Sequence, residues 1–364
     1  MAAAALDVLP VPVTDGVVIS KYGHLGEPLP GLRFFEAGHP VPDENSVTAA
    51  EATLKLTESL TETDTVLFLL SGGGSALFEK PLVPLAELQD VTKQLLACGA
   101  DIVEINTIRK RLSAVKGGKF AAHCVPAQVE AVILSDVLGD PLDMIASGPV
   151  SPDSLGCGDA LRIAEKYALK LSEAAQRCLN EETPKSLSNV NAQIVGSVRE
   201  LCRAASDACR AMGYEPVLLT DQLDCEAREA GRFLAAILRA HANDGKKLAF
   251  LAGGETVVHL TGNGLGGRNQ ELALAACEGL RGIKNAAVIS VGSDGTDGPT
   301  DAAGGYVDGD TFDALKAADL DLHTVLQNND AYHALQTVGG LIVTGPTGTN
   351  VNDIAIALLD GEAE

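Results

Sequence analysis

Tryptophan is absent from this sequence of 364 residues, and all aromatic residues together make up only 4% of it. Aliphatic side chains must therefore fill the interior, and we expect cores built from Ala, Val, Leu and Ile. Long apolar runs are missing too, since none reaches the roughly 18 residues that a membrane-spanning helix needs. The first residues lack the basic and apolar regions of a signal peptide. The sequence predicts a soluble, cytoplasmic protein.

Positive charge is scarce as well, with 27 Lys and Arg residues against 49 Asp and Glu and a net charge of −22. Such a chain repels phosphate backbones and anionic lipids, so we expect no nucleic-acid partner and no membrane partner. An anionic substrate would need a local pocket of cations or backbone N–H groups. The eight cysteines form no CxxC pair and no metal-like spacing with the seven histidines. We therefore expect free thiols rather than disulfides.

Short apolar runs alternate with longer helical patterns along the chain, which is typical of α/β proteins with mainly parallel sheets. The expected strands are residues 16–20, 65–70, 129–134, 193–195, 216–219, 248–251, 256–260, 286–291 and 341–344. The expected helices are residues 85–98, 160–168, 198–212, 226–241, 269–280 and 330–338. The length favours two domains, and the polar junction "RAHANDGKK" at 239–247 predicts them at residues 1–243 and 247–364.

The stretch "LLSGGGSAL" ends an expected strand with Ser71, Gly72, Gly73, Gly74 and Ser75. One or two glycines would suffice for a tight strand-to-helix turn, which is the alternative interpretation. Three glycines between two hydroxyls expose backbone N–H groups and favour a site for an oxyanion or a phosphate. The loop is not a Walker A motif, because the GK[ST] ending is absent.

Two further segments of the first block carry charged side chains. "INTIRKRLSAVKGGK" gathers five cations in an acidic protein, among them Lys116 and Lys119. They indicate either a local anion site or a solvated face. "VILSDVLGD" places Asp136 at the carboxyl end of an expected strand, where it could hold Mg²⁺ or receive a proton from a hydroxyl group. The alternative is that Asp136 caps the next helix.

The second block contains "LAGGETVVHLTGNGLGGRNQELALAA", with a formal GxGxxG match at Gly262, Gly264 and Gly267. That pattern indicates a dinucleotide site, but no clear acidic residue ends a strand at the expected distance. Arg268 directly follows the glycines. As a Rossmann fingerprint the match is therefore weak.

The same segment is better suited to binding an anionic group. Arg268 is framed by glycines, and Asn269 is among the polar residues that open the following helix. Glu255, in "GGET", adds a carboxylate at the end of another expected strand.

Two glycine-rich loops close the chain. "SVGSDGTDGPTD" puts Asp294 and Asp297 after a strand, but the EF-hand pattern fails because no glutamate occupies loop position 12. We expect these aspartates to bind Mg²⁺ or to orient a hydroxyl group, with turn formation as the alternative. "TGPTGTNVND" offers Thr347 and Asn350 as donors, or forms a capped turn.

As a set, these motifs resemble the class II glycerate kinases, the glycerate 2-kinase family whose C-terminal domain is called MOFRL. The resemblance also includes "AGHPVPDENS" and extends over nearly the whole chain. It implies an α/β fold with an N-terminal Rossmann-like parallel-sheet domain, a smaller C-terminal α/β MOFRL domain and an active site in the cleft between them. It also implies ATP- and Mg²⁺-dependent phosphorylation of D-glycerate to 2-phosphoglycerate. The arginine of the family's GGRNQE motif, which is considered catalytic, matches Arg268.

Together with our own interpretation of the motifs, the resemblance predicts the following roles. The expected catalytic residues are Arg268, Asp136 and Asp294, and the expected metal ligands are Asp294 and Asp297. The expected substrate- and phosphate-binding residues are Ser71, Gly72, Gly73, Gly74, Ser75, Lys116, Lys119, Glu255, Asn269, Thr347 and Asn350. The oligomeric state stays open, with a homodimer among the options.

Members of the family carry a further Gly-Lys-Ala segment, whose lysine is considered catalytic, shortly before the part that "MAAAALDVLP" resembles. No Gly-Lys-Ala step occurs in this sequence. This leaves two alternatives to an active kinase. One is an oxidoreductase of the hydroxypyruvate reductase type, and the other is a catalytically impaired protein that binds glycerate or nucleotide.

Overall fold

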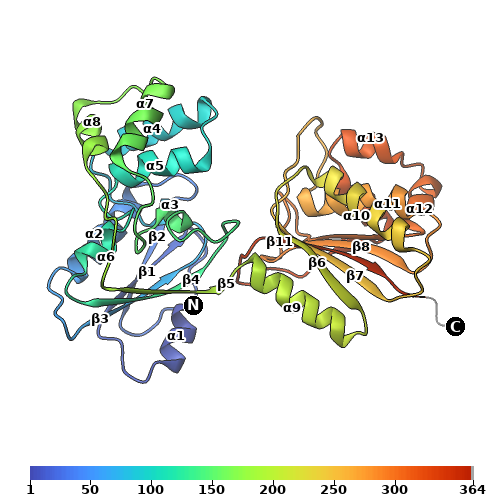
Figure 1. Ribbon diagram of the computed structural model, residues 1–364, viewed down its shortest axis with the longest axis horizontal. Helices are drawn as coiled ribbons and strands as arrows, with labels where there is room; N and C mark the ends of the chain where they lie inside the picture. The colour runs from blue at the N-terminus through green and yellow to red at the C-terminus, as the bar shows by residue number, and fades with distance from the viewer. Residues whose placement is uncertain (362–364) are drawn as a thin grey trace. The chain divides into compact units, whose positions relative to one another are not determined.

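The computed structural model describes residues 1–361, and its contacts divide the chain into two compact units (Figure 1). Unit 1 contains Met1–Leu134 and Asp140–Val195, and unit 2 contains Ser135–Gly139 and the chain from Gly196 onward. This division lies well before the junction expected at 239–247. Strand β6 pairs with β7 and helix α10 packs on α11, so the segment before the junction belongs to unit 2. The limits 1–243 and 247–364 stay a prediction about sequence modules.

Unit 1 contains two small sheets (Figure 1). Strands β1 (Gly16–Lys21) and β2 (Leu32–Ala37) pair in parallel. A second sheet has the order β3 (Thr65–Leu70), β4 (Gln128–Leu134) and β5 (Val190–Gly196). Strands β3 and β4 pair in parallel. The parallel sheets expected for the N-terminal part are thus present, and β2 is an additional strand that the sequence analysis did not predict.

Unit 1 contains α5, a helix that the sequence analysis did not predict, and α4, α7 and α8 pack against it. The helices of unit 1 are α1 (Ala2–Val8), α2 (Glu44–Leu56), α3 (Gly74–Leu77), α4 (Leu85–Ala97), α5 (Ile102–Leu112), α6 (Lys119–His123), the short 3₁₀ helix η1 (Ile145–Ser147), α7 (Cys157–Lys166) and α8 (Glu173–Asn180). Asp101 caps α5 in a reciprocal pair with Glu104. Ile105, Ile108 and Leu112 recur at helical spacing and pack against α4, α7 and α8, which fixes the orientation of α5.

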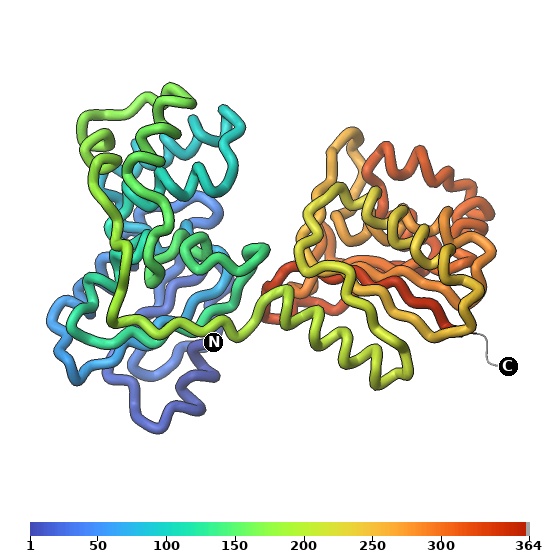
Figure 2. Tube along the Cα trace, viewed as in Figure 1, coloured from blue at the N-terminus to red at the C-terminus, as the bar shows by residue number. Residues whose placement is uncertain are grey.

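Unit 2 is built on one six-stranded sheet with the order β10-β9-β8-β11-β7-β6. The strands are β6 (Glu215–Leu223), β7 (Leu248–Gly254), β8 (Ala286–Gly292), β9 (Gly304–Asp308), β10 (Leu341–Ile342) and β11 (Asp353–Leu359). Only β6 and β7 pair in parallel, and the other neighbours pair antiparallel. The reason is β11, the last strand within residues 1–361, which lies between β7 and β8 and runs against both (Figure 2). The mainly parallel arrangement expected for both blocks is therefore wrong for this sheet.

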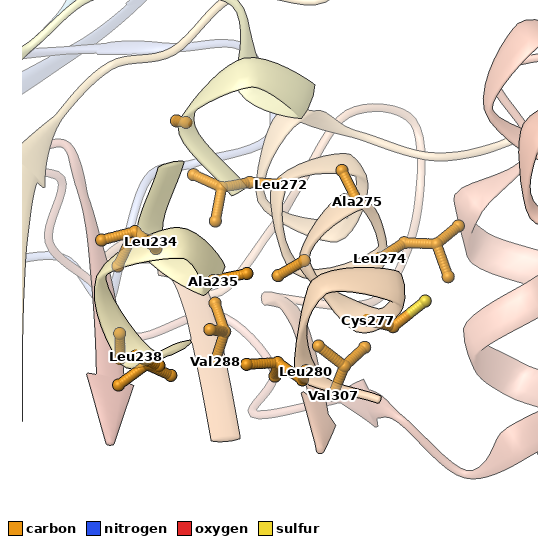
Figure 3. Close-up of a cluster of buried hydrophobic side chains, with 14 of the residues drawn as sticks. Leu234, Ala235, Leu238, Leu272, Leu274, Ala275, Cys277, Leu280, Val288 and Val307 are labelled. Carbon is orange, nitrogen blue, oxygen red and sulfur yellow. The ribbon is translucent and has the colours of Figure 1, made fainter. Parts of the chain in front are cut away.

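Helices cover both faces of the sheet in unit 2 (Figure 1). Successive residues of β7 point to opposite faces. Phe250 belongs to the cluster formed with α10 (Ala227–His241) and α11 (Arg268–Leu280), and Leu251 belongs to the cluster formed with α9 (Val198–Ala211). Figure 3 shows the first cluster, in which Leu234 and Leu272 are labelled. The remaining helices are α12 (Thr311–Ala317), α13 (Leu322–Gln327) and α14 (Ala331–Val338).

One expected strand, residues 256–260, does not form. The segment makes a single isolated bridge, between Val257 and Glu226, and Val257 and Leu260 are 50% and 81% exposed. An apolar pattern without a neighbouring strand to pair with does not become a strand, because backbone pairing and burial stabilise strands together.

Candidate functional site

The glycine loop after β3 is shaped by close packing. Gly73 has a φ of +84°, and a Cβ atom there would lie 3.1 Å from the ring of His39. A Cβ atom on Gly74 would lie 2.7 Å from the Cβ of Ala146. The glycines are therefore needed for backbone conformation and for the approach of neighbouring segments. Their binding of an anion stays a prediction.

Ser75, at the end of this loop, is held at its side chain and its backbone. Its hydroxyl lies 3.0 Å from the hydroxyl of Ser147, and Ser147 donates a hydrogen bond of 2.9 Å to Oδ1 of Asn106. Arg109 donates a hydrogen bond of 2.8 Å to the carbonyl of Ser75. Ser147 adopts this position with a φ of +61°, which is unfavourable for a residue other than glycine. Local strain of this kind is common where a binding loop is held in place.

Lys116 and Lys119 have partners inside unit 1. Lys116 is fully buried, donates to the carbonyl of Phe78 at 2.9 Å and lies 3.5 Å from the buried carboxylate of Glu79. Lys119 donates to the three carbonyls of Lys110, Arg111 and Ser113 at the end of α5, at 3.1, 3.3 and 2.6 Å. Both lysines thus hold the protein's own backbone. Their direct contact with a substrate stays a prediction.

Burial changes the acidity of both lysines. Desolvation lowers the pKa of Lys116 to about 8, and the charge of Glu79 opposes this change. Desolvation also lowers the pKa of Lys119 to about 8. The neighbouring Lys110 and Arg111 are also buried, and they pair with Asp153 at 3.0 and 3.2 Å. The basic cluster therefore faces inward and is not a solvated surface.

In unit 2, Arg268 is held between two carboxylates at the first position of α11. Asp353, the first residue of β11, accepts hydrogen bonds from Nε at 2.5 Å and from a terminal nitrogen at 3.1 Å. Glu255 lies 3.0 Å from the other terminal nitrogen. Burial alone would lower the pKa of Arg268, but Asp353 and Glu255 raise it, so the guanidinium is charged at every accessible pH.

Asp297 caps the same helix from a neighbouring loop. Its two carboxylate oxygens accept hydrogen bonds from the backbone N–H groups of Asn269 and Gln270 at 3.1 and 2.9 Å, and from the side-chain amides of both residues at 3.3 and 3.0 Å. A carboxylate at a helix N-terminus is favoured by the orphan donors and by the helix dipole. Burial raises the pKa of Asp297, and the hydrogen bonds from the helix backbone lower it. Asp297 and Asn269 therefore fix the position of Arg268.

Asp294 lies in the loop that follows β8, and this loop contacts the segment before β11. Its carboxylate accepts hydrogen bonds from the backbone and the hydroxyl of Thr296, both at 2.9 Å. Thr347 donates its hydroxyl to the carbonyl of Ser293 at 2.5 Å and its backbone N–H to the carbonyl of Asp294. Asn350 accepts from the backbone of Asn352 within its own turn. These contacts order the two loops, and ligand binding by Thr347 and Asn350 stays a prediction.

The carboxylates around Arg268 interact electrostatically. Partial burial raises the pKa of Glu255, Arg268 opposes this change, and the charges of Asp353 and Asp136 raise it further. Asp136 thus lies within electrostatic reach of Glu255. Among residues 1–361, no group of three or more His, Cys, Asp or Glu side chains is arranged to hold a metal ion.

The glycines of the GxGxxG match contact the protein itself. Cβ atoms on Gly262 and Gly264 would lie 2.4 and 2.5 Å from atoms of Asn328 and Asp330. A Cβ atom on Gly267 would lie 2.3 Å from the carboxyl group of Asp297. These glycines admit neighbouring side chains and backbone, which explains their spacing without a dinucleotide.

Comparison with known proteins identifies relatives of this chain. Residues 1–180 match the family model described as a domain of unknown function (DUF4147), and residues 248–353 match the MOFRL family. A Thermotoga maritima protein named D-glycerate 2-kinase is 53% identical over 99% of this chain and 88% of that protein. A Pyrococcus horikoshii protein named glycerate 2-kinase is 42% identical over 99% of this chain and 84% of that protein.

This chain belongs to the glycerate 2-kinase family. The crystal structure of a glycerate kinase from Thermotoga maritima matches it with a TM-score of 0.96 at 53% identity, covering 99% of this chain and 88% of that chain. The resemblance inferred from the motifs is therefore confirmed. Within residues 1–361, no helix has the length and apolar character needed to cross a bilayer.

The candidate site includes residues that sequence reasoning did not single out. Asp353 holds Arg268, and its only signal was an aspartate at the start of the alternating pattern "DIAIALL". Asn106 and Arg109 hold the glycine loop together with Ser147. Both lie in "INTIRKRLSAVKGGK", the segment that indicated either a local anion site or a solvated face, but their spacing of three residues on one helix could not be used because α5 was not predicted.

Proposed function

We propose that this protein transfers the terminal phosphoryl group of ATP to the 2-hydroxyl group of D-glycerate, giving 2-phosphoglycerate and ADP. The observation that carries the proposal is the 53% identity to a D-glycerate 2-kinase over 99% of this chain. The arrangement of Arg268 supports it, because a rigid, permanently charged guanidinium suits the negative charge that is spread over the oxygens of the transferring phosphoryl group.

In this proposal the bond from the glycerate 2-oxygen to the γ-phosphorus forms while the bond from that phosphorus to the β–γ bridging oxygen breaks. The hydroxyl proton leaves the attacking oxygen, and we assign its acceptor to Asp136. Arg268 stabilises charge on the transferring group, and Asp353 and Asp297 keep it oriented. Orientation matters because positioning supplies most of the catalysis in phosphoryl transfer.

Mg²⁺ is the expected metal, bound through one or two carboxylates together with the phosphates of ATP. Asp294 fits this requirement, since each of its oxygens accepts one hydrogen bond and keeps a further lone pair. Asp297 fits less well, because it is 3% exposed and already accepts four hydrogen bonds. A bound Mg²⁺ would neutralise phosphate charge.

Product identity tests the proposal. The protein is supplied with ATP, Mg²⁺ and D-glycerate, and the product is coupled to enolase alone, without a phosphoglycerate mutase. Phosphoenolpyruvate forms only if the phosphate is on the 2-position. L-Glycerate is the stereochemical control. No phosphoenolpyruvate, together with NADH oxidation when hydroxypyruvate is supplied, would instead favour the reductase alternative.

Cytoplasmic location and a small-molecule substrate without macromolecular partners are part of the same proposal. They are supported by the names of the relatives and by the net charge of −22.

A further inference from the structure

Arg109 differs from the other arginines at the sites described. Arg268 forms ion pairs with Asp353 and Glu255, and Arg111 pairs with Asp153 at 3.2 Å. Arg109, in contrast, takes part in no ion pair with any carboxylate of residues 1–361, and its only hydrogen bond there is to the carbonyl of Ser75. Its Nε atom is buried and has no hydrogen-bond partner.

This arrangement is costly unless an anion completes it. A guanidinium carries five N–H donors, and Arg109 uses one of its terminal nitrogens in a bond to a neutral carbonyl. Burial lowers the pKa of Arg109, and the charge of Glu79 opposes the change without forming an ion pair. Glu79 itself lies 3.5 Å from Lys116. The residue is partly exposed, so a ligand can reach it from solvent.

The position of Arg109 is fixed relative to the glycine loop. Asn106 and Arg109 project from the same face of α5, one holding the Ser75 hydroxyl through Ser147 and the other holding the Ser75 carbonyl. Because an amide oxygen only accepts, Ser147 must donate to Asn106, and Ser75 must donate to Ser147. The Ser75 hydroxyl proton is therefore committed to the protein. The guanidinium is left as the charged donor beside the loop.

We propose that Arg109 binds an oxyanion of a substrate at the edge of the 71–75 loop, either the carboxylate of the hydroxy acid or a phosphate of the nucleotide. This inference rests on the proposed function for the identity of the substrates. It assigns anion recognition in unit 1 to Arg109, where the sequence had indicated Lys116 and Lys119.

The test uses the full chain with Arg109→Gln and Arg109→Lys. Arg162→Gln is the matched control, since that side chain is 74% exposed. Binding of D-glycerate, of ADP with Mg²⁺ and of sulfate is measured by calorimetry, and KM is measured for D-glycerate and for ATP. Losing a charged hydrogen-bond partner should weaken binding of one substrate by about 10- to 100-fold in Arg109→Gln. The affinity of Arg109→Lys for that substrate should lie between those of the wild type and Arg109→Gln, because lysine keeps the charge.

The substrate whose affinity falls identifies the source of the oxyanion. Unchanged affinity for both substrates in Arg109→Gln, with a lower melting temperature, would overturn the proposal and leave Arg109 as a support for Ser75. Equal losses in Arg109→Gln and Arg109→Lys for both substrates would also overturn it, because a structural role does not depend on charge. A wild-type chain that binds none of the three probes would overturn it as well.

The proposed function fails separately from this inference. Absence of turnover in the wild-type chain contradicts the kinase proposal, whereas the calorimetric comparison still decides whether Arg109 binds an anion.

Discussion

Lys119→Met tests whether the basic cluster of unit 1 is structural. The substitution keeps an unbranched chain but removes all three hydrogen bonds from Nζ to the carbonyls at the end of α5. Three hydrogen bonds from a charged donor are worth about 4–9 kcal/mol before costs. The fall of the Lys119 pKa to about 8 shows that burial opposes the charge, and this cost is about 3 kcal/mol. We expect a net loss of about 2–5 kcal/mol in the free energy of unfolding of unit 1.

For a unit of this size, that loss corresponds to a fall of about 5–15 °C in the melting temperature. Scanning calorimetry measures it, and Lys93→Met, at an exposed position of α4, is the matched control. The KM for D-glycerate should stay within about twofold of the wild-type value, because no donor of Lys119 is left for a substrate. A melting temperature within about 2 °C of the wild type, with a KM raised tenfold or more, would refute the reasoning.

The same pair of proteins predicts a pH dependence. The pKa of Lys119 is about 8 in the folded state against an ordinary value of 10.5, so the folded state binds fewer protons than the unfolded state between these values. The free energy of unfolding must then rise with pH across this window. The stability of the wild type relative to Lys119→Met should therefore increase from pH 8 to pH 10 in urea titrations. A difference that is flat or shrinks would contradict the lowered pKa.

Three further substitutions test the rest of the account. Asp353→Asn removes the charge that orients Arg268 and should lower kcat by about 10- to 1000-fold. The control is Asp313→Asn, which changes an exposed aspartate in an ion pair and should leave kcat unchanged. Equal kcat values in the two variants would contradict the proposed orientation of Arg268 by Asp353. Asp297→Ala removes the hydrogen-bond acceptor at the N-terminus of α11 and should lower the unfolding free energy of unit 2 by about 2–4 kcal/mol in urea titrations. A loss below about 0.5 kcal/mol would show that α11 does not need this cap. Gly73→Ala places a side chain beside His39 at a φ of +84°, and the resulting backbone strain of about 1–2 kcal/mol should raise KM at least fivefold. The control is Gly99→Ala, which has a φ of +72° and open space around it and should change only stability.

The sequence predicted the regular elements best where one pattern dominates. Strand β3 was predicted with its observed bounds, because a six-residue apolar run ends at a glycine loop. Strand β11 was missed, although it lies near the centre of its sheet, because its antiparallel pairing depends on strands about 60 and 100 residues earlier. Helix α5 was missed, because the run of charged residues that contains Lys110 and Arg111 was interpreted as either a local anion site or a solvated face. In the structure both are buried and paired.

The site residues divide in a similar way. Arg268 could be found from the sequence because glycines frame it and a helix follows it. Its partner Asp353 is 85 residues away, and no local pattern reports a contact over that separation. Asp297 was expected to bind a metal, since an aspartate on a glycine-rich loop gives the same signal whether it binds a cation or caps a helix. Only the positions of Asn269 and Gln270 show that it caps α11.

The most direct test of the central claim is the release of ADP from ATP and Mg²⁺ by the full chain, with and without D-glycerate, and in parallel with Arg268→Ala. The account predicts release that depends on D-glycerate and that falls by about 100-fold or more in Arg268→Ala, because the substitution removes the cation held by Asp353 and Glu255. Release that does not depend on D-glycerate, or that is unchanged in Arg268→Ala, would contradict it.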